Sequence, residues 1–129
     1  MGRVQVMEAV VGVEESAASP GMHSRHYAPR TAAYRFGRDQ WPVARGFAEA
    51  HVPAALITWD AGVALEAPHQ TILLPGEERG YARAIYAALR EADGMGVRVI
   101  LVLEVPGEAG MWAAVEDRVR RATEVLPGV

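Results

Sequence analysis

The sequence contains neither cysteine nor lysine, and each absence excludes a class of chemistry. Without cysteine the chain has no disulfide bond, no thiolate nucleophile and no cysteine-ligated zinc site. Without lysine it has no P-loop lysine and no amine that could form a Schiff base. No apolar run approaches the roughly 18 residues of a membrane-spanning helix, and the N-terminal segment lacks the features of a signal peptide. We therefore predict a cytoplasmic protein that does not contact a membrane.

The composition is that of one folded domain with a short additional segment. The chain has 129 residues, 50% of them hydrophobic and 22% charged, which is enough to bury a core without disulfide bonds or metal. Residues 23–45 hold five Arg and one acid, for a charge of +4, whereas the remaining residues carry −7. The net charge of −3 argues against non-specific electrostatic binding, so we expect no direct binding to nucleic acid.

The first 31 residues carry two different patterns. Residues 3–11 place apolar side chains at helical spacing and predict a short helix that ends at Gly12. Residues 14–31 contain two Pro, one Gly and three Ser without a sustained period, which predicts an extended connector. We therefore divide the chain into a helical remnant (1–13), an extended linker (14–31) and a domain (32–129).

From residue 32 onward, strand and helix patterns alternate. Short apolar runs predict strands, and apolar stripes at helical spacing predict helices. The predicted strands are residues 33–36, 54–59, 70–74 and 97–103, and the predicted helices are residues 42–51, 77–93 and 110–125. Such alternation implies right-handed crossovers between parallel strands. We therefore predict an α/β fold, a Rossmann-like three-layer α/β/α sandwich with a mostly parallel sheet of four or five strands.

Polar residues at the predicted strand ends form a candidate ligand-binding site. Parallel α/β sheets bind ligands at the carboxyl ends of their strands, where this sequence places Asp60, Gly62 and Glu104. The two carboxylates are the best placed for acid–base work, although ordinary loop carboxylates are the commoner case. The glycine-containing turn at residues 107–110 has amides that could hold a phosphate, but acids flank it and no cation is adjacent. A helix-opening turn is the favoured interpretation.

The segment 19–30, SPGMHSRHYAPR, carries the most chemistry for its length. Its two arginines can bind phosphate or carboxylate groups, and Tyr27 can stack on a base. Its prolines lower the entropy cost of ordering the segment on a partner. His23 and His26 lie three residues apart, but no third ligand is nearby, and we predict no metal site. On composition alone, a partner-binding segment and a solvated linker are equally supported.

This segment resembles the interdomain linker of two-domain threonylcarbamoyl-AMP synthases. The matching residues are Ser19, Pro20, Gly21, Met22, Arg25, His26, Tyr27 and Pro29, whereas His23 and Ser24 depart from the Lys-Tyr form common in that family. Residues 84–123 are similar to the end of that family's C-terminal domain, with an A-L-R-E-x-D helix, a strand, a Glu-Pro-rich turn and a helix ending D-R-x-x-R-A. The resemblance runs from about residue 3 to residue 125.

The resemblance implies an accessory role in an enzyme. The family makes threonylcarbamoyl-AMP from threonine, bicarbonate and ATP, and the product serves the N6-threonylcarbamoyladenosine modification of tRNA. The chemistry belongs to an N-terminal YrdC-like catalytic domain, which is the implied partner, in cis or in trans. The linker residues named above would close over its catalytic site. The resemblance also implies that this chain holds no catalytic residue and binds no cofactor of its own, and that ATP and Mg are substrates of the full enzyme.

Two other functions are compatible with the residues. A free-standing Rossmann-like module could bind a small ligand or a nucleotide near Asp60, Gly62 and Glu104. Alternatively, a self-association module could use one of the three tryptophans as its contact.

Overall fold

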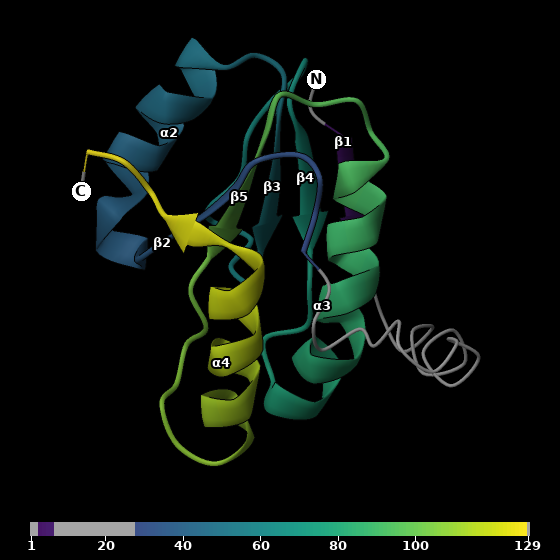
Figure 1. The fold of residues 1–129 in the computed structure, drawn as a ribbon, viewed down its shortest axis with the longest axis vertical. Coiled ribbons are helices and arrows are strands. Elements are labelled where there is room, and N and C mark those ends of the chain that lie inside the picture. Colours follow the sequence, from purple (N-terminus) through teal and green to yellow (C-terminus); the bar gives the residue numbers. More distant parts are fainter. Residues whose placement is uncertain (1–2, 7–27, 129) are drawn as a thin grey trace.

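The computed structural model describes residues 3–6 and 28–128, which form one parallel sheet with helices on both faces (Figure 1). The strands are β1 (Arg3–Val6), β2 (Ala33–Phe36), β3 (Ala54–Thr58), β4 (Gln70–Leu73), β5 (Val99–Leu103) and β6 (Glu124–Val125). The helices are α2 (Trp41–Ala50), α3 (Glu78–Asp93) and α4 (Met111–Ala122), and the 3-10 turn η2 (Arg38–Gln40) leads into α2. The order of strands across the sheet is β1-β4-β3-β5-β2-β6, and every strand pair is parallel.

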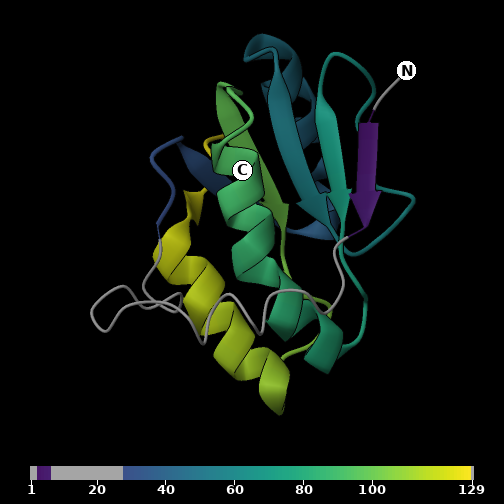
Figure 2. The same cartoon turned by 90° about the vertical axis from the view of Figure 1, so that its right-hand side faces the viewer.

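The helices cover both faces of this sheet, as Figures 1 and 2 show together, and one apolar core lies on each face. On one face α3 and α4 pack against the strands, with Leu89 and Val115 among the buried residues. On the other face α2 contributes Ala44 and Ala48. The central strands β3 and β5 are buried along their whole length. These observations confirm the predicted three-layer α/β/α sandwich.

Local sequence explains where the clearest helix begins and ends. Glu77, the N-cap of α3, accepts hydrogen bonds from the backbone amides of Arg79 and Gly80, which the first turn of a helix leaves without partners. Gly94 follows the last residue of α3. The predicted helices 42–51 and 77–93 and the predicted strands at 33–36, 54–59, 70–74 and 97–103 are confirmed to within two residues at each end.

The predicted helix at residues 3–11 is wrong over the residues that the structure describes. Residues 3–6 form β1, which pairs in parallel with β4 and is an edge strand of the sheet. The sequence Arg-Val-Gln-Val alternates polar and β-branched residues, a pattern that suits a strand. Pairing with the backbone of β4 therefore outweighs a weak helical spacing. Residues 7–11 lie outside the described part of the chain.

The last helix ends earlier than predicted, and the sheet has six strands instead of four or five. Thr123 adopts an extended backbone after α4, and its hydroxyl donates a hydrogen bond of 2.6 Å to the carbonyl of Val119. The guanidinium of Arg35 on β2 donates to the Thr123 carbonyl at 2.9 Å. These contacts turn the chain so that β6 can pair with β2. Strands β1 and β6 are the two that the sequence pattern did not predict.

The predicted linker lies almost entirely outside the described residues. Of residues 14–31, the structure describes only 28–31, and these have no regular secondary structure. The division into a remnant, a linker and a domain therefore stays a prediction at its N-terminal boundaries. In the described part of the chain, no helix combines the length and the apolarity that crossing a membrane requires.

Candidate functional site

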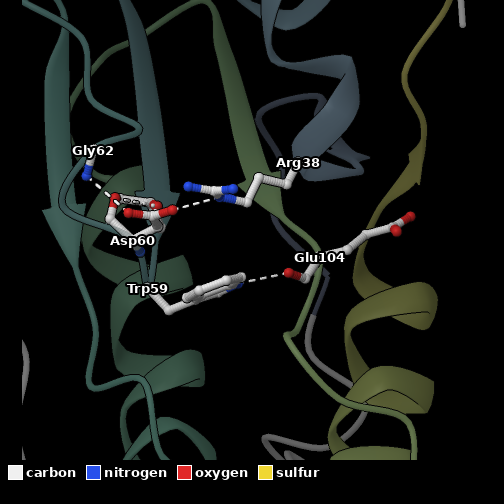
Figure 3. A network of polar contacts seen from close by, with 6 residues as sticks. Arg38, Trp59, Asp60, Gly62 and Glu104 are labelled. Carbon is white, nitrogen blue, oxygen red and sulfur yellow. Dashed lines mark hydrogen bonds and ion pairs between the residues drawn. The ribbon is translucent and has the colours of Figure 1, made fainter.

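Three neighbouring strands end in polar residues at the carboxyl edge of the sheet, where two contacts, Arg38 with Asp60 and Trp59 with Glu104, link the strand ends (Figure 3). Arg38 lies just after β2, Asp60 just after β3, and Glu104 directly after β5. These strands are adjacent because β5 lies between β3 and β2. The structure therefore brings together the candidate residues Asp60, Gly62 and Glu104 that the sequence placed at strand ends, and it adds Arg38.

Both carboxylate oxygens of Asp60 are engaged within the domain. Oδ1 accepts a hydrogen bond of 2.9 Å from the backbone amide of Gly62, and Oδ2 forms an ion pair with Nε of Arg38. The buried hydroxyl of Thr58 holds the backbone of Asp60 in place. It accepts a hydrogen bond of 3.0 Å from the Asp60 amide and donates one of 3.1 Å to the Asp60 carbonyl. Gly62 thus acts through its backbone, as the third residue of a tight turn that Asp60 initiates.

These contacts set the protonation state of Asp60. The amide of Gly62 has the largest effect, followed by the guanidinium of Arg38, and together they lower the pKa of the Asp60 carboxyl below its ordinary value. Asp60 is therefore ionised at neutral pH. It can attract a cation or hold Arg38, but it cannot donate a proton as a general acid.

Trp59 joins the end of β3 to the end of β5. Its indole Nε1 donates a hydrogen bond of 2.6 Å to the backbone carbonyl of Glu104, and its ring packs against both apolar cores. The side chain of Glu104 extends away from the pair formed by Arg38 and Asp60 (Figure 3). The two candidate carboxylates consequently do not face each other, and the geometry does not support an acid–base pair.

The glycine-containing turn before α4 does not form a phosphate cradle. Gly110 has φ +64°, and a Cβ at this position would lie 3.2 Å from Oε2 of Glu78, so a carboxylate from α3 already lies beside the N-terminus of α4. Gly107 packs closely on the indole of Trp112, since a Cβ at this position would lie 2.5 Å from Cδ1 of that ring. With Glu77 capping α3, carboxylates lie at both neighbouring helix N-termini, where they would repel an anionic ligand. The favoured interpretation, a helix-opening turn, agrees with this geometry.

Arg38 is the residue of this site that the sequence analysis missed. Its side chain is 65% exposed, whereas that of Asp60 is 18% exposed, so the terminal nitrogens of Arg38 reach solvent beyond the ion pair. The available signal was its position, two residues after the end of a predicted strand and in the basic segment 23–45. A guanidinium paired with one carboxylate can bind a small polar ligand, but this pair of charges does not favour a polyphosphate.

The linker residues predicted to contact substrate are not described. Ser19, Pro20, Gly21, Met22, Arg25, His26 and Tyr27 lie outside the described part of the chain. Pro29 is described and is half-buried. Within residues 3–6 and 28–128, no group of three or more His, Asp or Glu side chains is arranged to hold a metal ion.

The sheet, its two helical layers and the polar carboxyl edge define a Rossmann-like α/β domain. The family model of the threonylcarbamoyl-AMP synthase C-terminal domain matches residues 3–123, so the chain belongs to this family. The chain is also similar to a crystal structure of P. abyssi Sua5 complexed with L-threonine, with 31% sequence identity and a TM-score of 0.59. That similarity covers 81% of this chain but only 32% of the Sua5 chain. The comparison with curated proteins gives no match.

Proposed function

We propose that this chain is the accessory domain of a threonylcarbamoyl-AMP synthase. In this role it supports the formation of threonylcarbamoyl-AMP from threonine, bicarbonate and ATP, which supplies the N6-threonylcarbamoyladenosine modification of tRNA. The family match across residues 3–123 carries the proposal. The similarity to Sua5 adds support, because it extends over most of this chain and only a third of that longer protein.

The catalytic chemistry belongs to a YrdC-like domain that acts as the partner of this chain. ATP and Mg are its substrates, and this chain binds no cofactor of its own. The geometry of the carboxyl edge is consistent with an accessory role, since Asp60 is engaged by Gly62 and Arg38 and the carboxylates of Glu77 and Glu78 lie at the helix N-termini. The predicted linker connects to β2 and closes over the partner's catalytic site.

Reconstitution in trans tests this function. A purified YrdC-like catalytic domain is assayed for pyrophosphate release from ATP, with threonine, bicarbonate and Mg, with and without this chain. We expect the chain alone to be inactive and the mixture to turn over faster than the catalytic domain alone. Pyrophosphate release by the isolated chain, or equal rates with and without it, would contradict the proposal.

Linker variants separate linker closure from simple association of the two domains. We expect Tyr27→Ala and Arg25→Ala to lower the turnover of the mixture by roughly tenfold or more, because substrates that are held less precisely react more slowly. Arg83→Ala, which removes an exposed guanidinium from α3, is the matched control and should leave the rate unchanged. Unchanged rates in both linker variants would exclude a closing role for the linker.

The second candidate function is a free-standing module that binds a small ligand or a nucleotide. The exposed guanidinium of Arg38 at the carboxyl edge of a parallel sheet is the observation that favours it. Calorimetric titration of the chain with ATP, AMP and threonine tests this function, with Arg38→Ala as the comparison. Absence of heat at millimolar ligand, or equal binding by the variant, would exclude a site at Arg38.

A further inference from the structure

Asp93, the last residue of α3, holds the chain where it enters the domain. Its Oδ1 accepts a hydrogen bond of 2.9 Å from the backbone amide of Thr31, and its Oδ2 accepts one of 3.1 Å from the amide of Arg30. The partners are separated from Asp93 by 62 and 63 residues in sequence. We call this pair of contacts the Asp93 clamp.

Asp93 lies at the C-terminal end of α3. The C-terminal end of a helix carries a partial negative charge, so an acidic side chain there is electrostatically unfavourable. Two hydrogen bonds from backbone amides to an ionised carboxylate are charge-assisted and more than offset that cost. Asp93 is also the Asp of the A-L-R-E-x-D pattern, so the clamp gives a structural role to a residue of that motif.

A cavity borders the part of the chain that the Asp93 clamp holds. Residues 28–34 line a cavity of about 250 Å³ together with residues 121–124, at the end of α4 and the start of β6. The next backbone contact along the chain is the hydrogen bond of 2.8 Å from the amide of Ile100 to the carbonyl of Ala32, where β2 begins. The Asp93 clamp therefore lies just before the first contact of β2 with the sheet, and it sets the direction in which the chain enters β2.

We propose that Asp93 is a positioning residue that fixes the origin of the linker on the domain. This inference rests on the proposed function, in which the linker acts on the partner catalytic domain. A linker that starts from a fixed point and direction samples a smaller volume than one that starts from a loose end. Its effective concentration at the partner's site is correspondingly higher. Loss of the clamp should therefore slow turnover without weakening the binding of substrates, which the catalytic domain holds.

The local part of the inference is tested on this chain alone. Amide hydrogen exchange is measured by NMR for Arg30 and Thr31 in wild type, Asp93→Ala, Asp93→Asn and the control Glu91→Gln. We expect Asp93→Ala to lower the protection of both amides by about tenfold or more. Asp93→Asn keeps one acceptor oxygen and should retain part of the protection. Glu91→Gln also removes a negative charge from the end of α3 and should leave both amides protected. Unchanged protection in Asp93→Ala would overturn the clamp.

The functional part is tested in the reconstituted reaction with the catalytic domain. We expect Asp93→Ala to lower kcat roughly tenfold with the KM values for ATP and threonine unchanged, and Asp93→Asn to restore part of the rate. Glu91→Gln should match wild type. Wild-type kcat in Asp93→Ala, despite lost amide protection, would overturn the positioning role. If the wild-type chain fails to stimulate the catalytic domain, both the proposed function and the positioning role are wrong. The existence of the Asp93 clamp is tested separately, by the exchange measurement.

Discussion

Asp60 and Asp93 are both half-buried carboxylates that accept backbone hydrogen bonds, but they lie at opposite ends of the sheet. Asp60, at the carboxyl end, bonds to Gly62 two residues away and to Arg38 in the preceding strand–helix connection. Asp93, at the amino end, bonds to amides more than 60 residues away. The first carboxylate closes a turn within the domain, whereas the second joins the domain to the segment before it.

A carboxylate therefore has a different use at each end of this sheet. In many parallel sheets a carboxylate at the carboxyl edge serves a ligand, but here Asp60 is engaged by the protein. The amino edge has no such general role, yet there Asp93 determines how an adjoining segment is attached. The attachment of the adjoining segment therefore depends on the edge of the sheet opposite to the one that usually binds ligands.

The largest effect is expected at Trp59, which holds the carboxyl edge together. Trp59→Ala removes its packing on both cores and its hydrogen bond to Glu104, and should lower the free energy of unfolding by about 3 kcal/mol. Trp59→Phe keeps most of the packing and should cost about 1 kcal/mol. Urea denaturation measures both. A loss well below 1 kcal/mol in Trp59→Ala would show that this edge is not held by the indole.

The next effect is expected at the opposite edge. Asp93→Ala removes two charge-assisted hydrogen bonds but also relieves an unfavourable interaction with the helix dipole, so the net loss should be about 2 kcal/mol. Glu91→Gln relieves a similar interaction without losing these bonds and should stay within about 0.5 kcal/mol of wild type. Equal stability of the two variants in urea denaturation would remove the proposed difference between the two ends of the sheet.

A smaller effect of opposite sign is expected at the start of α3. The hydroxyl of Tyr81 is fully buried and has no hydrogen-bond partner among the residues that the structure describes, and burial raises the pKa of this hydroxyl, so it remains neutral. Tyr81→Phe keeps the aromatic ring, whose centroid lies 5.4 Å from that of the Trp112 indole, and removes only the hydroxyl. The variant should be more stable by about 1 kcal/mol in thermal or urea denaturation. A loss of stability would indicate that the hydroxyl has a partner in solution.

The sequence predicted the centre of the sheet better than its edges. The runs AALIT and VILVL are apolar at nearly every position, which only strands buried on both faces require, and these became β3 and β5. Strands β1 and β6 are short and gain their structure by pairing with β4 and β2. Such pairing depends on neighbours that are distant in sequence, and a local pattern does not contain it.

In the candidate site, too, the sequence pattern predicted local positions but not contacts between distant residues. The positions of Asp60 and Glu104 at the carboxyl edge followed from the predicted strand ends. Their partners did not follow, because Arg38 and Trp59 reach across between strands whose order in the sheet the sequence leaves open. The Asp93 clamp joins residues 62 and 63 positions apart, and only the folded arrangement places the end of α3 beside the start of β2.

The smallest effect concerns the pH dependence of Asp60. Because its pKa is lowered in the folded state, Asp60 stabilises the fold fully above about pH 4, the ordinary pKa of an exposed aspartate. This contribution is lost as the pH falls through the lower folded-state pKa. Asp60→Asn should therefore be less stable than wild type at pH 6.5, and the difference between them should shrink at pH values near 2.5.

Urea denaturation of both chains across this range measures the effect, with Glu108→Gln as a control for an exposed acid in a loop at the same edge. The control should follow wild type at every pH. A difference between Asp60→Asn and wild type that is constant from pH 6.5 to 2.5 would mean that the carboxylate acts through its shape alone. In that case the charge of Asp60, which pairs it with Arg38, would add nothing to stability. The carboxylates of Asp60 and Asp93 would then stabilise the two ends of the sheet in different ways, although both accept backbone hydrogen bonds.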